Sequence, residues 1–175
     1  DPEWLKELFP DDLTLTDGAA WDDTRRRVVS RKETKFRDLV LEGKESDHGI
    51  NLDAAAELLA TRVLSGELIL KNWDDSVNQW TYRLAALGRW MPELGMPGWS
   101  EQDRIDAVAQ ICHGSVSYKE IKEANVWRVL RDWLSGGQRA ALDSYCPERV
   151  NLPNGQTAKV TYSEDRDPFI SVRVS

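Results

Sequence analysis

Residues 73–92 read WDDSVNQWTYRLAALGRWMP, and this stretch contains the clearest predicted helix of the 175-residue chain. Its large apolar side chains follow one another at intervals of four, three, four, three and four residues, which places them on one face of an α-helix. Proline has no N–H group and cannot continue a helix, so Pro92 is expected to end this one. The apolar positions are Trp73, Val77, Trp80, Leu84, Leu87 and Met91.

Shorter helical patterns lie on both sides of this helix, and together they predict a helical block over about residues 51–146. Asn51 and Asn125 are suitable N-cap residues. Three further segments begin with a serine that is followed three residues later by a carboxylate or an amide, which is the pattern of a capping box. These pairs are Ser100 with Asp103, Ser117 with Glu120, and Ser135 with Gln138.

Strand patterns flank the helical block on both sides. Between residues 13 and 42, alternating side chains predict three or four antiparallel strands. Turns are expected at Asp17-Gly18 and at Asp22-Asp-Thr24, because Asp and Gly favour turn conformations. A second strand pattern covers residues 149–174 and contains Asn154-Gly155, the dipeptide typical of tight hairpins.

Three strands, a helical element and two further strands follow the order of an OB-fold, a small Greek-key barrel. A lone hairpin is marginally stable in water, so we expect the two sets of strands to pair in one antiparallel sheet or barrel. The predicted fold is therefore α+β, with residues 1–50 and 147–175 forming an OB-like part. Residues 51–146 form a large helical insertion, and residues 44–49 link the first strands to it.

The composition is 41% hydrophobic and 30% charged, which is enough apolar material for a core and excludes a disordered chain. The apolar runs are too short to span a bilayer, and the first residues lack the features of an export signal. The two cysteines, Cys112 and Cys146, suggest no disulfide framework and favour a reducing cytoplasm. The chain has no initiator methionine and ends at Ser175 within a strand pattern, so we interpret it as a piece of a longer protein.

A cluster of cations, here called the basic island, stands out against the net charge of −7. Residues 25–37 carry a local charge of +6, and the rest of the chain carries −13. Lys and Arg that neutralise phosphates supply most non-specific affinity for nucleic acids, and the flanking Trp21 and Phe36 are candidates for stacking on bases. A solvated strand whose cations protect a sheet edge is the structural alternative. The island comprises Arg25, Arg26, Arg27, Arg31, Lys32, Lys35 and Arg37.

Other candidate sites are weaker. Cys112 and His113, even with His48 and Cys146, lack the two closely spaced ligand pairs of a zinc site. Adjacent side chains on a helix point about 100° apart, so Cys112 and His113 do not form a nucleophile pair. The paired aspartates lie at turns and helix starts, where Asp has ordinary structural roles. We therefore predict no catalytic residue and no metal site.

The most distinctive segments lie in the last third of the chain. Together they resemble the C-terminal region of the HrpB-type bacterial ATP-dependent helicases, which are relatives of the DEAH-box RNA helicases. The resemblance is weak over residues 19–42, better from Ala60 to Trp80, and strong from Ile111 onward. The segments are Ile111–Lys122, Trp133–Ser135, Tyr145–Arg149, Leu152–Gly155, Lys159–Ser163 and Pro168–Arg173.

The resemblance implies a parent helicase whose motor uses ATP and Mg²⁺ and is followed by an OB-like domain. This chain has no G-x-x-x-x-G-K-[ST] loop and no Asp-Glu-Ala-His sequence, so we expect it to hold no cofactor and to hydrolyse no ATP alone. The favoured function is a non-catalytic accessory region that binds single-stranded RNA or DNA weakly, or whose basic island docks onto an acidic face of the motor. The alternative is a module that recruits a protein partner through the helical block, notably residues 90–99. No membrane partner is expected.

Overall fold

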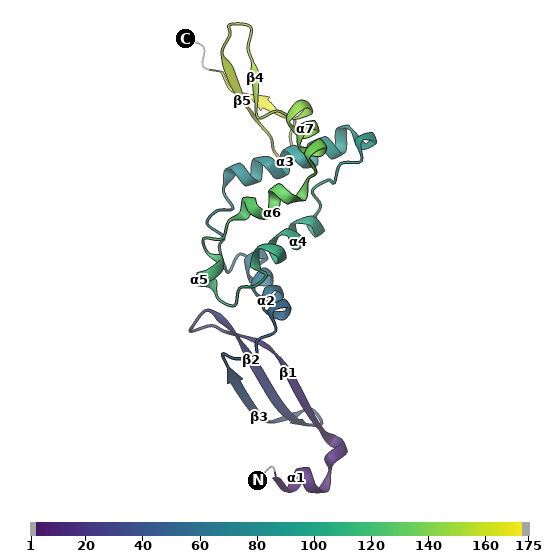
Figure 1. Ribbon diagram of the computed structural model, residues 1–175, viewed down its shortest axis with the longest axis vertical. Coiled ribbons are helices and arrows are strands. Elements are labelled where there is room, and N and C mark those ends of the chain that lie inside the picture. The colour runs from purple at the N-terminus through teal and green to yellow at the C-terminus, as the bar shows by residue number, and fades with distance from the viewer. Residues whose placement is uncertain (1–2, 173–175) are drawn as a thin grey trace. The chain divides into compact units, whose positions relative to one another are not determined.

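The computed structural model describes residues 3–172 and contains helices and antiparallel sheets, which confirms the α+β class (Figure 1). The helices from α2 to α7 lie between residues 52 and 145, where the sequence predicts helices. The chain divides into two compact units. The first unit comprises residues 1–70 and 108–124, and the second comprises residues 71–107 and 125–175.

The first unit opens with a short helix and a three-stranded antiparallel sheet of order β1-β2-β3. Strand β1 continues through Asp17 and Gly18, so the turn predicted there is wrong. Both residues are held in the ladder with β2, where Asp17 also lies 3.8 Å from the ammonium group of Lys32. The predicted turn after Asp22 is confirmed. The elements are α1 (Glu3–Leu8), the 3-10 helix η1 (Pro10–Asp12), β1 (Leu13–Asp22), β2 (Arg27–Phe36) and β3 (Leu39–Ser46).

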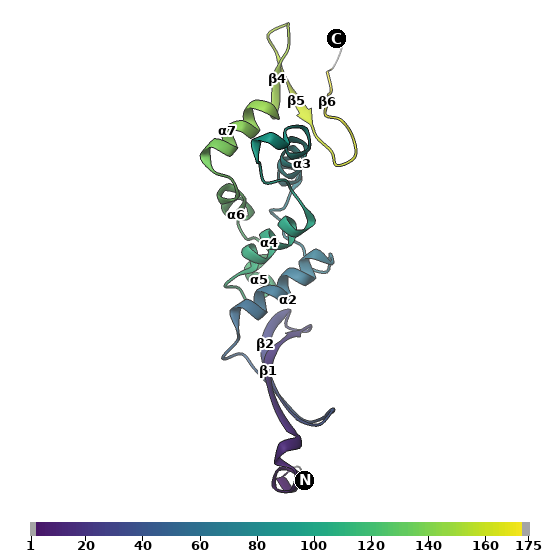
Figure 2. The ribbon, with the colours of Figure 1, turned by 90° about the vertical axis from the view of Figure 1, so that its right-hand side faces the viewer.

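Helix α2 (Leu52–Leu64) lies across one end of this sheet in both ribbon views (Figures 1 and 2). It starts where predicted, because the Asn51 side chain accepts hydrogen bonds from the N–H groups of Asp53 and Ala54. The predicted linker is shorter than expected, since β3 continues to Ser46. The buried core of this unit includes Val28, Val29, Leu59, Leu68, Ile111, Cys112 and Ile121.

Residues 116–118 act as an additional partner for strand β2. The N–H group of Val28 donates to the carbonyl of Val116 at 2.6 Å, and the N–H group of Tyr118 donates to the carbonyl of Arg26 at 3.0 Å. This segment leads into α5 (Tyr118–Ile121), whose predicted capping box between Ser117 and Glu120 is present. The first sheet is therefore extended by residues that come from the helical part of the sequence.

The second unit is built around helix α3 (Asp75–Trp90), the helix predicted most clearly from the sequence. Val77, Leu84 and Leu87 are fully buried, and the chain leaves the helix at Met91, just before Pro92. The predicted capping boxes at Ser100 and Ser135 are confirmed. The other helices are η2 (Pro92–Leu94), α4 (Glu101–Cys112), whose last residues belong to the first unit, α6 (Val126–Trp133) and α7 (Gly136–Tyr145).

A second three-stranded sheet, of order β4-β5-β6, follows α7. The side-chain amide of Gln79 on α3 binds the strand end like a neighbouring peptide group. Its Nε2 donates to the carbonyl of Tyr162, and its Oε1 accepts from the Tyr162 N–H group, both at 2.8 Å. The predicted strand residue Val174 lies outside the described residues. The strands are β4 (Arg149–Asn151), β5 (Thr157–Thr161) and β6 (Phe169–Ile170).

The prediction of one OB-like sheet is wrong for this chain. Within residues 3–172, the strands form two separate three-stranded sheets, and no closed barrel is formed. Each set of strands does have further backbone partners, but these partners come from its own unit and not from the other set of strands. Strand β2 pairs with residues 116–118, and the end of β5 binds Gln79.

The guanidinium of Arg83 joins three parts of the second unit. Arg83 lies on α3 with only 3% of its surface exposed. Its Nε donates to the carbonyl of Cys146 at 2.7 Å, and its terminal nitrogens donate to Asp143 at 2.8 Å and to Glu148 at 3.1 Å. A buried charge is costly unless it is paired and hydrogen-bonded, and this arrangement meets both conditions. It fixes the end of α7 and the start of β4 against α3.

We expect Arg83→Lys to lower the free energy of unfolding by roughly 1–3 kcal/mol, because an ammonium group cannot make three hydrogen bonds in the directions of the guanidinium fork. Glu148→Gln and Asp143→Asn should each cost less than about 1 kcal/mol, because these carboxylates are about three-quarters exposed and solvent screens them. Urea unfolding of the three variants measures the difference. Wild-type stability for Arg83→Lys would contradict this assignment.

Because the thiol of Cys112 is buried, the folded protein is expected to lose stability at alkaline pH. Burial raises the pKa of Cys112 from 9.0 to about 12. Above pH 9 the unfolded chain releases this proton while the folded chain retains it, so stability falls as pH rises towards 12. Between pH 8 and pH 10, the free energy of unfolding of wild type should fall by about 1.4 kcal/mol more than that of Cys112→Ala. All other titrating groups are the same in the two proteins, so their contributions cancel in the comparison. Urea unfolding at both pH values tests this, and equal losses would contradict it.

Candidate functional site

The basic island is contiguous in sequence but dispersed in the first unit. Successive side chains of a strand point to opposite faces of the sheet. Arg31 and Lys35 of β2 therefore lie on one face, and Lys32 lies on the other. Arg25 and Arg26 fall in the turn between β1 and β2, while Arg37 falls in the turn after β2. The cations thus do not form one surface patch.

Carboxylates of the same unit pair with most of these cations. Arg25 donates two hydrogen bonds to Asp47, at 2.9 and 2.5 Å, and these bonds lower the pKa of Asp47 and raise that of Arg25. Arg26 instead lies over the ring of Tyr118, 4.3 Å from its centroid. The further pairs are Arg27 with Asp47 (3.8 Å), Arg31 with Glu33 (2.7 Å), Lys35 with Glu33 (3.2 Å), Lys32 with Asp17 (3.8 Å) and Arg37 with Asp12 (3.2 Å).

These pairs change the electrostatic character expected of the region. Residues 13–47, which comprise the sheet and its turns, contain eight acidic and eight basic side chains. Ion pairs on a surface contribute little stability, but opposite charges at this distance cancel each other's field. The sheet is therefore close to electrically neutral, although β2 alone is strongly basic. Nucleic-acid contact by the island stays a prediction.

The two aromatic residues proposed to stack on bases lie at opposite ends of the β1–β2 ladder. Trp21 pairs with Val28 at one end, where the guanidinium of Arg62 lies 4.7 Å from the ring centroid. Phe36 pairs with Leu13 at the other end, and its ring packs edge-on against Phe9 at a centroid distance of 6.0 Å. Each ring already has an intramolecular partner in the fold.

The residues considered for metal or nucleophilic chemistry serve other purposes. Cys112 and Cys146 are free, buried thiols. His113 lies 3.2 Å from Asp53 through its Nε2 atom. Among the described residues, no group of three or more His, Cys, Asp or Glu side chains is placed to hold a metal ion. In the same part of the chain, no helix has the length and apolar character needed to cross a membrane.

Five tryptophans of the second unit form a cluster with Trp99 at its centre. The Trp99 ring contacts three others, at centroid distances of 6.3 Å to Trp73, 5.7 Å to Trp80 and 5.7 Å to Trp133. Trp80 also contacts Trp127 at 6.2 Å, and most of these pairs have the edge-to-face geometry that the ring quadrupoles favour. Trp99, which lies in the segment 90–99 considered from sequence for docking, therefore contributes to packing, and so does Trp127. Trp90 remains 49% exposed.

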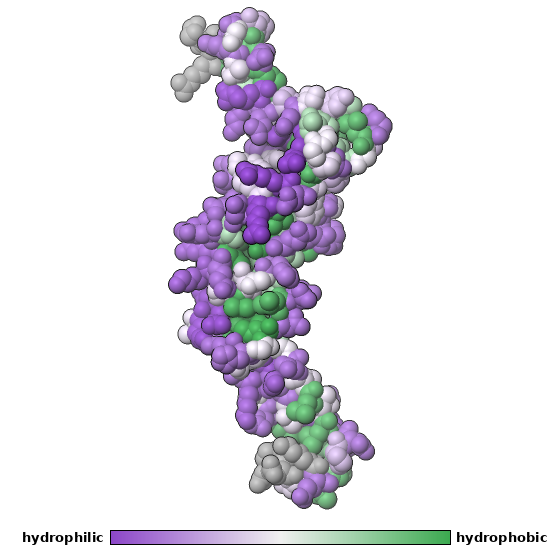
Figure 3. Space-filling model, viewed as in Figure 1, coloured by the Kyte–Doolittle hydropathy of each residue, from purple (hydrophilic) through white to green (hydrophobic). Residues whose placement is uncertain are grey.

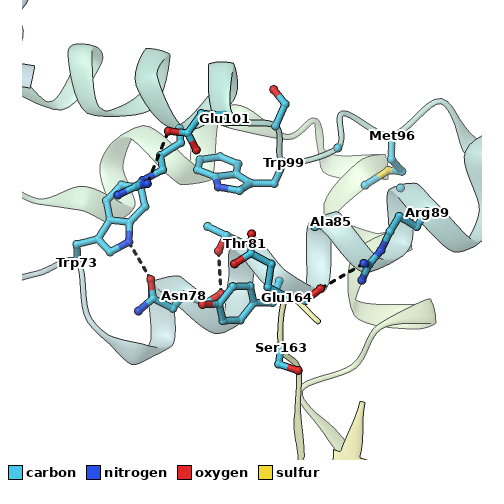
Figure 4. Close-up of a pocket in the computed structure, with 15 residues that line it drawn as sticks. Trp73, Asn78, Thr81, Ala85, Arg89, Met96, Trp99, Glu101, Ser163 and Glu164 are labelled. Carbon is cyan, nitrogen blue, oxygen red and sulfur yellow. Dashed lines mark hydrogen bonds and ion pairs between the residues drawn. The ribbon is translucent and has the colours of Figure 1, made fainter. Parts of the chain in front are cut away.

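A pocket of about 710 Å³ lies beside the tryptophan cluster in this unit (Figure 4). Trp73 and Trp99 line one side, and polar groups of α3, including Asn78 and Thr81, line another. The Trp73 indole N–H donates to Asn78 at 3.0 Å, and Arg89 donates to the carbonyl of Glu164 at 3.3 Å. The pocket is lined by aromatic rings and by both acidic and basic side chains, so its lining favours no single class of ligand. Recruitment of a partner through residues 90–99 stays a prediction.

The position of the loop that carries Trp99 depends on two glycines. A Cβ atom added to Gly88 on α3 would lie 3.3 Å from the Cα atom of Gly98. That distance is shorter than ordinary side-chain contacts, so the helix and the loop approach each other backbone to backbone. Both glycines line the pocket.

A pair of cations that the sequence analysis did not single out lies on the β4–β5 hairpin. Arg149 and Lys159 are directly opposite each other in the ladder. Both are exposed and line a second, smaller pocket of the unit, with a volume of about 250 Å³. Because they are ten residues apart in sequence, they do not appear as a charge cluster, and only the strand register brings them together.

An exposed apolar surface, here called the apolar end, lies on the first sheet away from α2. Leu13, Phe36 and Leu39 are neighbours across the three strands, and Leu15 follows on the same face. Leu15 is 82% exposed and Leu39 is 64% exposed. Figure 3 shows hydrophobic side chains gathered over this part of the sheet, beside α1. The apolar end comprises Phe9, Leu13, Leu15, Phe36 and Leu39.

Comparison with known proteins gives a consistent result. Residues 108–175 match the family described as "ATP-dependent helicase C-terminal". The chain is 24% identical to the ATP-dependent RNA helicase HrpB of Escherichia coli K12 over 99% of its own length and 22% of that protein. A crystal structure of the E. coli DExH-box NTPase HrpB shares the fold, with a TM-score of 0.64 at 22% identity, over 99% of this chain and 22% of that one.

A second structure, of the E. coli DEAH/RHA helicase HrpB, gives a TM-score of 0.63 at 22% identity, over 94% of this chain and 21% of that one. The chain thus spans about a fifth of the length of the relatives that it matches. The match to the helicase C-terminal family covers the region where the predicted resemblance is strongest. These findings confirm that the chain resembles a C-terminal region of the HrpB-type helicases.

Proposed function

We propose that this chain is a non-catalytic accessory region of a DEAH-type helicase and that its first sheet docks onto another part of the same polypeptide. The relatives are about five times longer than this chain, so most of such a polypeptide lies outside it. An accessory region must be held against the motor to influence it. The apolar end is the observation that carries this proposal.

The apolar end has the features of a surface that is covered in the working protein. Soluble proteins rarely leave adjoining large apolar side chains exposed unless they serve an interface. Here such side chains occupy neighbouring positions on all three strands, with Leu15 and Leu39 well exposed to solvent. Because the cations of the first sheet are already paired with carboxylates, the sheet is better suited to dock through its apolar end than through its cations onto an acidic face of the motor.

Weak contact with single-stranded RNA or DNA through the basic island remains a second part of the proposal. Lys32 and Arg37 support it, since their side chains are largely exposed beyond their ion pairs. A phosphate would have to compete with Asp17 and Asp12 for these cations, so the affinity would be low and sensitive to salt.

Cysteine labelling tests the docking surface. Leu15→Cys in the 175-residue chain should react quickly with a maleimide at neutral pH, because the side chain is exposed. In the complete helicase polypeptide the same residue should react at least tenfold more slowly. The native thiols provide little background, because burial raises the pKa of both Cys112 and Cys146.

Leu52→Cys is the matched control, because Leu52 is an exposed leucine of the same unit that lies outside the apolar end. It should react at similar rates in both proteins. Equal rates for Leu15→Cys in both proteins would refute docking. Protection of Leu15→Cys in the 175-residue chain together with dimer formation in sedimentation would instead assign the surface to a second copy.

A further inference from the structure

The β4–β5 hairpin holds two like charges in an arrangement that costs stability. Arg149 of β4 and Lys159 of β5 are directly opposite in the antiparallel ladder. Like charges at directly opposite positions destabilise a strand pair. The Cα atoms of such a pair lie roughly 4.5–5.5 Å apart, so both side chains can reach one small anion. The fold therefore accepts a local repulsion that an anion would relieve.

Neither cation has a carboxylate partner among the described residues, in contrast with most of the basic island. Residues 149–163 contain Arg149 and Lys159 and no acidic residue. The Nε atom of Arg149 donates to the hydroxyl of Thr157 at 3.2 Å, which orients the guanidinium along the neighbouring strand. The hairpin is thus a positively charged element in a chain with a net charge of −7.

The two cations line a concave site of about 250 Å³ in the second unit. The buried guanidinium of Arg83 and the polar side chains of Ser76 and Gln79 also line it. The single carboxylate of the lining belongs to Glu148, which is bound by Arg83 at 3.1 Å. Arg83 also binds Asp143, so two carboxylates face its one positive charge, and with Arg149 and Lys159 the whole group carries a net charge of +1.

We propose that Arg149 and Lys159 form a binding site for a phosphate group, supplied by the backbone of a single-stranded nucleic acid. A phosphodiester offers oxygens that can accept hydrogen bonds from a guanidinium and an ammonium group together. The site has space for one phosphate and part of its sugar, and it contains no aromatic ring on which a base could stack. It therefore holds the backbone without reading the sequence. The inference does not depend on the docking surface of the first sheet.

Titration of a fluorescent single-stranded oligonucleotide at two salt concentrations tests this site. Arg149→Ala/Lys159→Ala should weaken binding about tenfold and reduce the salt dependence by about 0.7 for each phosphate that the protein no longer neutralises. The same double variant should unfold at an equal or higher temperature than wild type, because a like-charge pair has been removed. Weaker binding with retained stability separates a ligand site from a structural role.

Two control variants locate the effect. Arg131→Ala/Arg139→Ala removes the same charge from exposed positions on α6 and α7 and should bind almost like wild type. Arg27→Ala/Arg31→Ala/Lys35→Ala removes three cations of the basic island and should weaken binding less than the hairpin variant. The proposal is overturned if wild type does not bind at low salt, if the hairpin variant binds like wild type, or if either control loses as much affinity.

A parallel NMR titration distinguishes the source of the phosphate. Inorganic phosphate and the oligonucleotide are added separately to isotope-labelled protein, and the signals of Arg149 and Lys159 are followed. If the oligonucleotide shifts the signals of Arg149 and Lys159 at a much lower concentration of phosphate groups than inorganic phosphate requires, the bound phosphate belongs to a nucleic-acid backbone. Equal response to inorganic phosphate, per phosphate added, would overturn the nucleic-acid assignment in favour of a free-anion site.

Discussion

The buried guanidinium of Arg83 is the interaction on which the second unit depends. It is a charge on the inner side of α3, and its hydrogen bonds reach the end of α7 and the start of β4. The side chains that pair with it are largely exposed, so the geometry is set from the buried side. Arg83 also binds Glu148, the one carboxylate among the residues that line the pocket of Arg149 and Lys159. The same guanidinium therefore holds the start of the hairpin and pairs with the acidic group beside the two cations.

The helices were predictable because their signals are local. The apolar spacing from Val77 to Leu87 and the serine capping boxes depend on residues within one or two turns. Pairing of strands with distant partners has no such signal. Nothing near Gln79 in the sequence indicates that its amide binds the backbone of Tyr162, and nothing near Val116 indicates that it pairs with Val28. These two contacts replaced the predicted single sheet, while the α+β class was predicted correctly.

Charge was the least predictable property of the candidate sites. A run of cations in one strand was visible in the sequence, but its carboxylate partners include Asp17 of β1 and Glu45 of β3 in addition to Glu33 of the same strand. The pair on the hairpin shows the reverse case. A two-residue turn at Asn154-Gly155 would place Arg149 opposite Val160, whereas the actual five-residue connection places it opposite Lys159. A one-residue change of register moves a side chain to the other face, so the site follows from the connection length.

The close approach of Gly88 and Gly98 has a consequence for how the second unit tolerates change. The aromatic wall of the larger pocket is positioned by a contact between two main chains, and no side chain mediates that contact. A methyl group on Gly88 would require the loop at Gly98 to move by a few tenths of an ångström, and Trp99 is the next residue of that loop. Because Trp99 contacts three other tryptophans, the approach of the two main chains is linked through one residue to the packing of the whole cluster.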